Sequence, residues 1–480
     1  MDLIVFFAFL AAVVLFGCSF FRRSSSGASA FTKAEGNVPT WVVGMSIFAT
    51  FVSSISFLGL PGGSYSGNWN QLIFSLTIPL AIWLAAKIFI PLYRGIGSVS
   101  AYQFLEDRYG WWARCYVALC YLLTQVCRVG SILLLLAIPI STMFGWDIST
   151  IIIVTGALTL LFSLLGGISA VVWTDAIQGI VLIAGALVCA LILTFGMPEG
   201  PGQLFRIAAD AGKFSLGSFS LTLREPTVWV VLVYGIFINL QNFGIDQNYI
   251  QRYMTAKSTK DAVKGTLFGG LLYIPVSLLF VYIGTALFSY YSAQPGLLPE
   301  GISGDKVFPY FIVHGLPDGL TGLVVAALFS AGISTVSTSI NSSATIVFTD
   351  FFSKFRKEET GSKKTQMRVL YMASAAVGLV GILIGLAMQK IDGVLDAWWK
   401  LSSIFSGGML GLFLLALVCR KPDRTASIVA VAAGILVIAW MSLPVFQCPI
   451  HSYLTIVFGT TTIFLVGFCL TCVVRRIKNE

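Results

Sequence analysis

The sequence predicts an all-α, polytopic membrane protein, and three observations lead to this fold class. The chain has 480 residues, of which 57% are hydrophobic and only 11% charged, a composition that soluble domains do not have. Apolar runs long enough to cross about 30 Å of hydrocarbon recur along its whole length. The basic residues, which give a net charge of +9, gather in short connections at alternate ends of these runs. They therefore indicate membrane topology and not nucleic-acid binding.

About thirteen apolar runs are long enough to be transmembrane helices. The first begins after Asp2 without a basic leader and is followed by Arg22–Arg23, so we expect a membrane helix and not a signal peptide. Only Gly166–Gly167 separates the fifth run from the sixth. Most basic clusters fall on one side, which predicts an extracytoplasmic N terminus and a cytoplasmic C terminus. The predicted helices cover residues 3–21, 40–66, 71–93, 112–140, 148–167, 170–197, 227–253, 266–290, 317–349, 367–389, 395–418, 425–444 and 450–474.

The second and seventh runs are each interrupted by polar residues and glycines. The second contains Ser53 and Ser56 before Pro61, and the seventh contains three amide side chains at residues 239–242, between Gly235 and Gly244. These runs are five spans apart, so they enter the membrane from opposite sides. Interrupted helices at matching positions of two inverted halves point to a binding site near the midplane.

The fourth run carries an arginine deep in the membrane. Arg128 has no charged neighbour between Arg114 and Asp147, and it lies roughly 21 Å along the helix from Arg114. A charge at this depth costs about 2.5–3.5 kcal/mol to insert, so it normally faces a polar cavity. A guanidinium offers a planar fork of donors that suits a carboxylate. The alternative is an arginine paired to another helix for structure alone.

The ninth run is rich in hydroxyls, and the sixth contains an acid. Ser330, Ser334, Ser337 and Thr338 share one helix face, where their oxygens could bind a hard cation such as Na⁺ or could serve helix packing. Asp175 could cap a helix start, bond to the backbone or ligate a cation.

We expect the remaining polar residues to lie at the membrane boundaries or to take no part in a reaction. We expect Asp246 and Arg252 to be interface or gate residues, and Asp350 to be solvated at the cytoplasmic boundary. The two histidines, His314 and His451, lie near segment ends, which excludes a histidine-rich metal site. No nucleophile, base and acid converge, so we do not expect an enzyme. Nothing in the sequence indicates an obligate protein partner.

Four stretches together resemble the sodium:solute symporter family. The resemblance implies a leucine-transporter-like fold with two inverted five-helix repeats, which agrees with the two interrupted runs. Within the family, the segments at 100–106, 127–129 and 239–243 are most similar to those of bacterial sodium/sialic acid symporters. The four stretches, in family order, are Ser46–Phe57, Gly166–Gly179, Asp246–Arg252 and the Ser/Thr-rich ninth run.

The resemblance also implies roles for individual residues. It implies a family-wide sodium site and, in the sialic acid group, a second one. Three pocket positions depart from that group, because Phe51 and Ser75 replace a Thr and a Gln, and Gln71 replaces a Phe. The implied substrate residues are Arg128, which would hold the carboxylate, with Ser53, Ser56, Phe51, Gln71, Ser75, Asn239 and Gln241. The implied sodium ligands are Ala49, Val52, Ala331, Ser334 and Thr335 for the first ion, and Ser334, Ser337, Thr338 and Asp175 for the second.

The sequence and the resemblance together predict a multi-pass protein of the bacterial inner membrane that imports a small organic anion with Na⁺. We expect sialic acid or a related sugar acid. The alternative substrate is a monocarboxylate or another vitamin- or amino-acid-like carboxylate, and the alternative class is a transporter-like receptor or channel. The expected units are an extra N-terminal helix and linker (1–37), the first repeat (38–197), an extracytoplasmic loop (198–225), the second repeat (226–418) and two additional helices with a basic tail (419–480).

Overall fold

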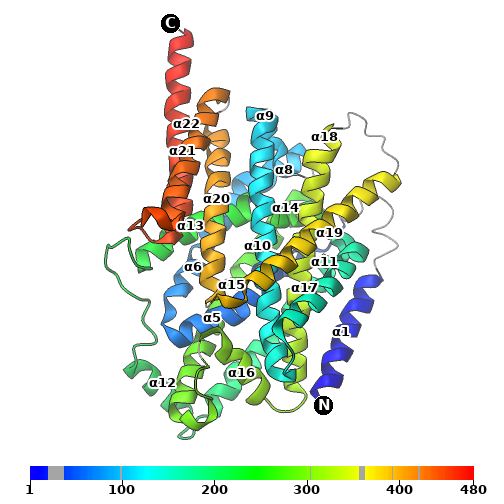
Figure 1. Cartoon of the computed structure of the whole chain (residues 1–480), viewed down its shortest axis with the longest axis vertical. Helices are drawn as coiled ribbons and strands as arrows, with labels where there is room; N and C mark the ends of the chain where they lie inside the picture. The colour runs from blue at the N-terminus through cyan, green and yellow to red at the C-terminus, as the bar shows by residue number, and fades with distance from the viewer. Residues whose placement is uncertain are drawn as a thin grey trace.

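The computed structural model describes residues 1–19, 37–97, 100–302, 304–355, 363–391, 393–419 and 422–479. Within these ranges the regular structure is helical, apart from one isolated β-bridge between Val38 and Ala256. The two termini lie at opposite ends of the molecule (Figure 1). The all-α prediction is therefore confirmed.

The helices differ widely in length, from single turns to one of 48 residues. The long ones are α1 (Asp2–Cys18), α4 (Thr40–Phe51), α5 (Ser54–Ser66), α10 (Trp111–Phe144), α11 (Ile148–Phe195), α12 (Pro201–Asp210), α13 (Val228–Ile245), α15 (Thr259–Ala293), α17 (Leu320–Ile346), α19 (Lys363–Ala387), α20 (Val394–Val418), α21 (Arg424–Ser442) and α22 (Thr455–Asn479). The short ones are η2 (Trp69–Gln71), α6 (Leu72–Leu76), α7 (Ile78–Leu84), η3 (Ala85–Phe89), α8 (Ile90–Ile96), α9 (Gln103–Tyr109), α14 (Gln247–Thr255), η4 (Pro295–Leu297), η5 (Gly304–Lys306), α16 (Val307–His314), η6 (Val347–Phe352), α18 (Ser353–Phe355), η7 (Met388–Lys390), η8 (Pro444–Phe446) and η9 (Ser452–Leu454).

The predicted count of thirteen spans is not confirmed. Among the described residues, ten helices are long and apolar enough to cross a membrane, or eleven if α4 and α5 form one bent span. The predicted helix end at Gly166–Gly167 is wrong, because α11 continues through both residues. A helical glycine costs only about 1 kcal/mol relative to alanine. In an apolar run the backbone gains more by keeping its internal hydrogen bonds, so two glycines do not end the helix.

Both predicted interruptions are present. Helix α4 ends at Phe51, and α5 begins at Ser54 after a bend of 51°. The hydroxyl of Ser53 caps the new helix by accepting from Ile55 N at 3.3 Å. Helix α13 ends at Ile245, and Asp246 caps α14 by accepting from Asn248 N at 2.7 Å. At each interruption, a short side chain with an acceptor oxygen thus caps the start of a new helix.

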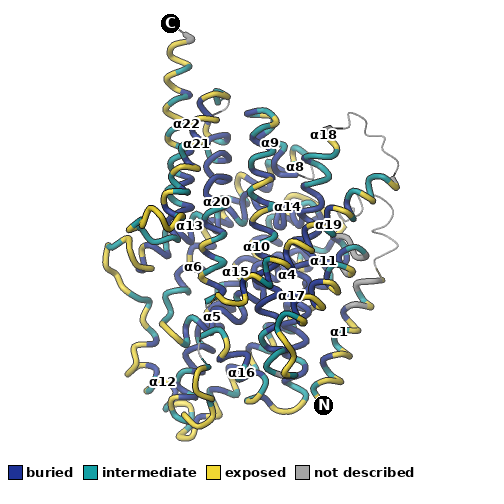
Figure 2. The backbone as a smooth tube through the Cα atoms, in the orientation of Figure 1, coloured by how far each residue is buried: buried dark blue, intermediate teal, exposed yellow. Residues whose placement is uncertain are grey.

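Helices α10 and α17 form the centre of the bundle. Figure 2 shows them mostly buried, whereas α12 and the outer faces of α21 and α22 are exposed. Helix α17 contacts α1, α10, α11 and α19. Glycine permits the closest approach at the seam between α4 and α15, because a Cβ on Gly269 would lie 2.1 Å from Gly44 O. This seam holds α4 firmly up to its interruption.

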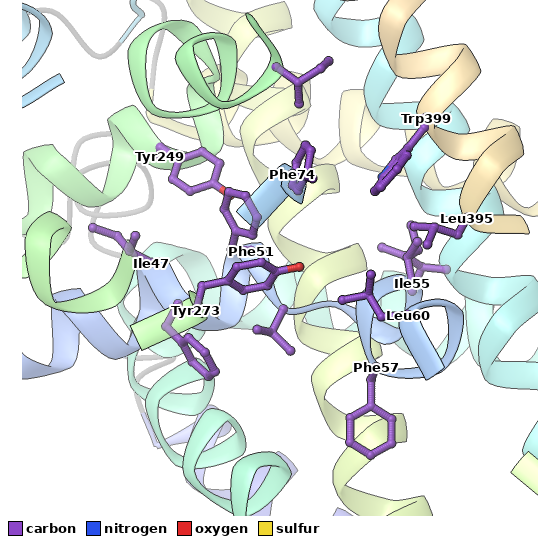
Figure 3. Packing of buried hydrophobic residues seen from close by; sticks show 14 of the residues in the cluster. Ile47, Phe51, Ile55, Phe57, Leu60, Phe74, Tyr249, Tyr273, Leu395 and Trp399 are labelled. Atoms are coloured by element: carbon purple, nitrogen blue, oxygen red, sulfur yellow. The ribbon is translucent and has the colours of Figure 1, made fainter. Parts of the chain in front are cut away.

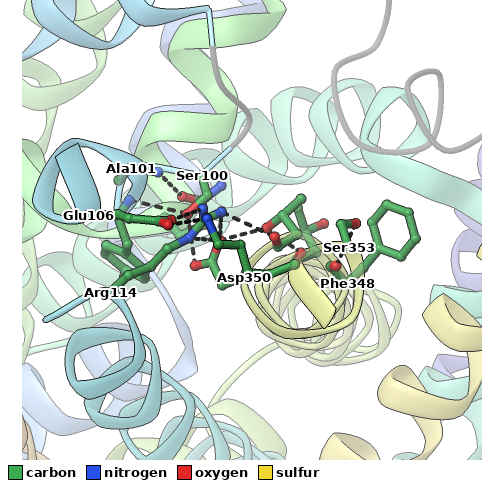
Figure 4. A network of polar contacts seen from close by, with 12 residues as sticks. Ser100, Ala101, Glu106, Arg114, Phe348, Asp350 and Ser353 are labelled. Carbon is green, nitrogen blue, oxygen red and sulfur yellow. Dashed lines mark hydrogen bonds and ion pairs between the residues drawn. The ribbon is translucent and has the colours of Figure 1, made fainter. Parts of the chain in front are cut away.

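One end of the bundle is closed by a network of charged side chains (Figure 4). Asp350, which we expected to be solvated, is buried, and its Oδ1 accepts from Arg114 Nε at 2.9 Å. Arg114 Nη1 also bonds to Glu106 Oε2 at 2.7 Å, and Lys354 pairs with Glu106. Burial opposes ionisation of Glu106, but the hydrogen bonds from Lys354 and Arg114 outweigh it and lower its pKa. The network joins α9, α10 and η6, which directly follows α17.

Candidate functional site

A cavity lies beside the interruption between α4 and α5. Five of the eight predicted substrate residues line its wall. Side chains of α10, α13, α15 and α20 complete the wall, so residues from both halves of the sequence meet there. The predicted residues on the wall are Phe51, Ser53, Ser56, Arg128 and Gln241.

Arg128 is buried at this cavity, as its isolation in the sequence predicted. Its Nη2 donates to Thr50 O at 2.6 Å, in the last turn of α4. That carbonyl is available because the helix ends one residue later and leaves the last carbonyls without amide partners. The bond ties the guanidinium to the interrupted helix while the head group remains on the cavity wall.

Asp246 also lies on the cavity wall, which the sequence reasoning missed. We had expected it to act at an interface or gate. The cavity therefore carries both a cationic and an anionic side chain. The signal that could have located Asp246 is its position at the interruption of the seventh run, since the chain there turns toward the midplane.

Aromatic rings make up much of the remaining wall (Figure 3). Phe51 stacks on Phe243, with ring centroids 5.5 Å apart, and contacts Tyr273 at 4.4 Å. On α20, Trp399 stacks on Phe74 at 5.2 Å. The sequence did not single out these rings, because aromatic residues form 13% of the chain and most of them pack elsewhere.

Three predicted substrate residues do not line this cavity. Gln71 lies on the wall of a second cavity, which shares Leu395 with the first. Ser75 is buried next to Phe74 but is not on the wall. Asn239 donates to Phe74 O at 3.0 Å and to Thr77 Oγ1 at 2.9 Å, so it joins α13 to the segment between α6 and α7.

The five residues expected at the first sodium site are all buried. Ala49 and Val52 lie in the last turn of α4 and at its interruption, where carbonyls lack intrahelical partners. On α17, Thr335 Oγ1 donates to Ala331 O at 2.9 Å. The oxygens that these residues offer are the hard ligands that Na⁺ requires. The ligand set stays a prediction.

Asp175 lies in the interior of α11, so it cannot cap a helix start. Its Oδ2 accepts from Ser46 Oγ on α4 at 2.6 Å, and its Oδ1 accepts from Ser334 Oγ on α17. Arg252 of α14 pairs with the same carboxylate, with Nη2 2.7 Å from Oδ2. Four helices thus meet at one buried carboxylate.

The guanidinium of Arg252 lies among the predicted ligands of the second sodium. It donates to Thr338 Oγ1 at 3.1 Å and to Ser46 Oγ at 2.8 Å. Ser337 is also buried, and its carbonyl accepts from Ser163 Oγ at 3.4 Å. Arg252 is fully buried, which contradicts the interface alternative of its expected interface or gate role. The structure therefore brings Asp175, Ser334 and Thr338 together around a positive charge that the protein itself supplies.

The comparison with protein families decides the broad class of this chain. The model of the sodium:solute symporter family matches residues 31–434. The chain belongs to this family. Among its relatives is the sodium/sialic acid symporter NanT of Aliivibrio fischeri, which is 30% identical over 98% of this chain and 92% of its own length. The sodium/sialic acid symporter SiaT of Proteus mirabilis is 30% identical over 90% of this chain and 88% of its own length.

Another relative of this symporter has a different substrate class in its name. The zebrafish sodium-coupled monocarboxylate transporter 2 is 27% identical over 92% of the chain and 73% of its own length.

Solved structures resemble this chain as well. A solved Na⁺-coupled sialic acid symporter in a substrate-bound outward-open state has a TM-score of 0.90, 28% identity and 98% coverage of both chains. The nucleobase-cation symporter Mhp1 has a TM-score of 0.59 at 15% identity, which supports the leucine-transporter-like fold alone. The relatives are transporters, which agrees with the expectation that the chain is not an enzyme.

Proposed function

We propose that this symporter imports a sialic acid or a related sugar acid together with Na⁺ by alternating access. The observation that carries the proposal is Arg128, a buried guanidinium on the wall of the central cavity. Its fork can bind a carboxylate with two parallel hydrogen bonds, which adds geometric specificity to charge. The serines and glutamine around it suit hydroxyl groups, and the aromatic rings suit the apolar faces of a sugar.

The names of the relatives support the substrate class. Two relatives of nearly full length are sodium/sialic acid symporters. The alternative is a monocarboxylate, because several relatives are sodium-coupled monocarboxylate transporters. The aromatic part of the wall, where Phe51, Phe74 and Trp399 meet, is the feature that favours this smaller and less polar substrate.

Sodium would bind where α4 and α17 meet. We propose a first ion at Ala49, Val52, Ala331, Ser334 and Thr335, and a second at Asp175, Ser334, Ser337 and Thr338. Binding of the second ion would require Arg252 to release Asp175. The basic connections would face the cytoplasm in a bacterial inner membrane, which places the N terminus outside.

Uptake by purified protein in liposomes tests this proposal. Radiolabelled sialic acid should accumulate above its external concentration when Na⁺ is outside, and should not when K⁺ or choline replaces it. Uphill accumulation distinguishes a transporter from a channel or a receptor. Competition with unlabelled lactate or pyruvate separates the two substrate classes. Equal uptake in choline would exclude sodium coupling. Na⁺-dependent uptake of radiolabelled lactate without uptake of radiolabelled sialic acid would assign a monocarboxylate.

A further inference from the structure

The connection between α21 and α22 (residues 443–454) packs against the cavity wall from outside the predicted repeats. Tyr453, in η9, is buried there. Its ring stacks on Tyr234 of α13, with centroids 4.9 Å apart and planes at 25°. It also meets Trp399 of α20 edge-on at 5.2 Å. Both Tyr234 and Trp399 line the cavity, and they contact each other at 5.4 Å. Tyr453 therefore holds two wall residues without lining the wall itself.

Hydrogen bonds fix this ring more tightly to α20 than to α13. The Tyr453 hydroxyl donates to Asp396 Oδ1 at 2.6 Å, one turn before Trp399. Ser403 Oγ of α20 donates to Tyr453 O at 3.1 Å and accepts from Ile456 N at 2.8 Å. On the α13 side, Tyr453 stacks its ring on Tyr234, and no hydrogen bond joins η9 to α13 among the described residues. His451 N donates to Leu223 O at 2.7 Å, in the segment before α13.

We propose that Tyr453 is a positioning residue that determines how tightly α13 and α20 close over the substrate. The proposal rests on the proposed function of the cavity. Because η9 is hydrogen-bonded to α20, it should move with that helix when the cavity opens. The stack of Tyr453 on Tyr234 is then the contact that separates on opening and re-forms on closing. Loss of the ring should favour the open form and speed substrate release, while the residues that touch the substrate stay in place.

Three variants test this role in liposomes. Tyr453→Leu removes the ring, Tyr453→Phe keeps the ring and removes the hydroxyl, and Asp396→Asn weakens the acceptor. The matched control is Tyr290→Leu, a half-buried tyrosine that packs on Tyr291 and Phe311 away from the cavity. We expect Tyr453→Leu to raise KM and the rate of substrate dissociation about tenfold, with the maximal rate retained.

The two milder variants isolate the hydroxyl bond. Tyr453→Phe and Asp396→Asn should each speed dissociation about threefold, and the double variant should be no worse than either, because both remove one interaction. The melting temperature and the Na⁺ dependence should remain as in the native protein. The inference is wrong if Tyr453→Phe and Tyr453→Leu both dissociate substrate at the native rate, or if KM is unchanged and only the maximal rate falls.

A cysteine reporter makes the test independent of the substrate. Ser402 lies on the cavity wall, so in a background whose native cysteines are replaced by serine, Ser402→Cys can be labelled by a membrane-impermeant thiol reagent when the cavity is open. Adding Tyr453→Leu should speed its labelling in the absence of any substrate, whereas adding Tyr290→Leu should not. If the native protein binds none of the acids, the proposed function fails. If labelling is also unchanged by Tyr453→Leu, the role of Tyr453 fails as well.

Discussion

At the residue scale, Arg128 has the most direct consequence for transport. Arg128→Lys keeps the charge but loses the fork, so binding of the anion should weaken. Arg128→Ala should lower affinity at least about tenfold, because a hydrogen bond to a charged group contributes about 1.5–3 kcal/mol. Isothermal titration with sialic acid measures both effects. Arg206→Ala is the matched control, since Arg206 is exposed and pairs with the exposed Glu199.

The methyl ester of the substrate provides the complementary measurement. It should lose most of its affinity for the native protein and little for Arg128→Ala, because it has no carboxylate for the fork to bind. Equal affinity of acid and ester in the native protein would contradict the assignment of an anionic substrate.

The pair of Asp175 and Arg252 leads to a second prediction. Arg252→Gln leaves a buried carboxylate without its cation, which should destabilise the protein by about 3–5 kcal/mol. Na⁺ at the same carboxylate should restore much of that stability, whereas choline should not. Thermal unfolding in the two salts measures this difference.

The charge-free double variant is the control for that experiment. Asp175→Asn with Arg252→Gln should show no greater stabilisation by Na⁺ than the native protein. Asp175→Asn alone should express well and reduce the slope of uptake against Na⁺ concentration. If Na⁺ stabilises Arg252→Gln no more than it stabilises the native protein, Asp175 does not ligate the ion.

The sequence predicted part of this site and missed the rest for a physical reason. The position of Arg128 could be inferred because an isolated charge in an apolar run must face a polar cavity. Arg252 and Asp175 are 77 residues apart, and each could reach several partners in a predicted bundle, so their ion pair could not be derived. The amide of Asn239 could bind a substrate hydroxyl as well as any polar side chain could. In the structure it instead donates to Phe74 O and so joins α13 to α6.

At the element scale, the interruption of α4 and the hydroxyl face of α17 define the expected first sodium site. Ser334→Ala with Thr335→Ala removes two hydroxyls from that face, so uptake should require a higher Na⁺ concentration. By linkage, the factor by which Na⁺ raises substrate affinity equals the factor by which substrate raises Na⁺ affinity, so both factors should fall together in this variant. Titration of uptake against Na⁺ measures the change. Ser343→Ala removes a buried hydroxyl about two turns further along α17 and should have no such effect.

The network of Glu106, Arg114 and Asp350 joins three elements at the other end of α17. Arg114→Gln leaves Asp350 buried and unpaired, so stability should fall by about 3–5 kcal/mol. Adding Asp350→Asn should recover part of the loss, and thermal unfolding of the single and double variants measures it. No recovery would show that Arg114 acts through other contacts.

The pKa of Glu106 sets the pH window for part of this stability. Because the pKa is lowered, the contribution is complete above the ordinary carboxyl value of about 4.3 and is lost as pH falls through the lowered value. Unfolding between pH 6 and pH 8 should therefore show no dependence on this group.

The elements themselves were predictable where polar residues interrupt an apolar run. Capping side chains mark the ends of α4 and α13, and the structure has both interruptions. Ser169 follows Gly166 and Gly167 closely, but it caps no new helix, because α11 continues through all three residues. The difference is that Ser53 and Asp246 satisfy amides of a new helix, whereas a glycine only weakens an existing one.

At the scale of the whole molecule, the number of ions sets the charge that moves. Two Na⁺ with one carboxylate would carry one net positive charge inward, worth about 2.3 kcal/mol per 100 mV. One Na⁺ with one carboxylate would carry none. We expect an inward current when sialic acid is added in Na⁺, measured on a supported membrane. A silent membrane alongside normal radiolabelled uptake would indicate a single ion.

The guanidinium of Arg252 beside Asp175 bears on how the empty protein resets. After cargo is released inside, the carboxylate still needs a counter-charge at a depth where water is scarce. The guanidinium of Arg252 compensates the charge of this carboxylate, so no cation from the cytoplasm has to bind there. The empty protein could then change from the inward-open to the outward-open state without a bound ion. This favours net uptake of substrate over exchange of internal for external substrate. Without this residue, resetting would depend on an internal cation, and the protein would run mainly as an exchanger.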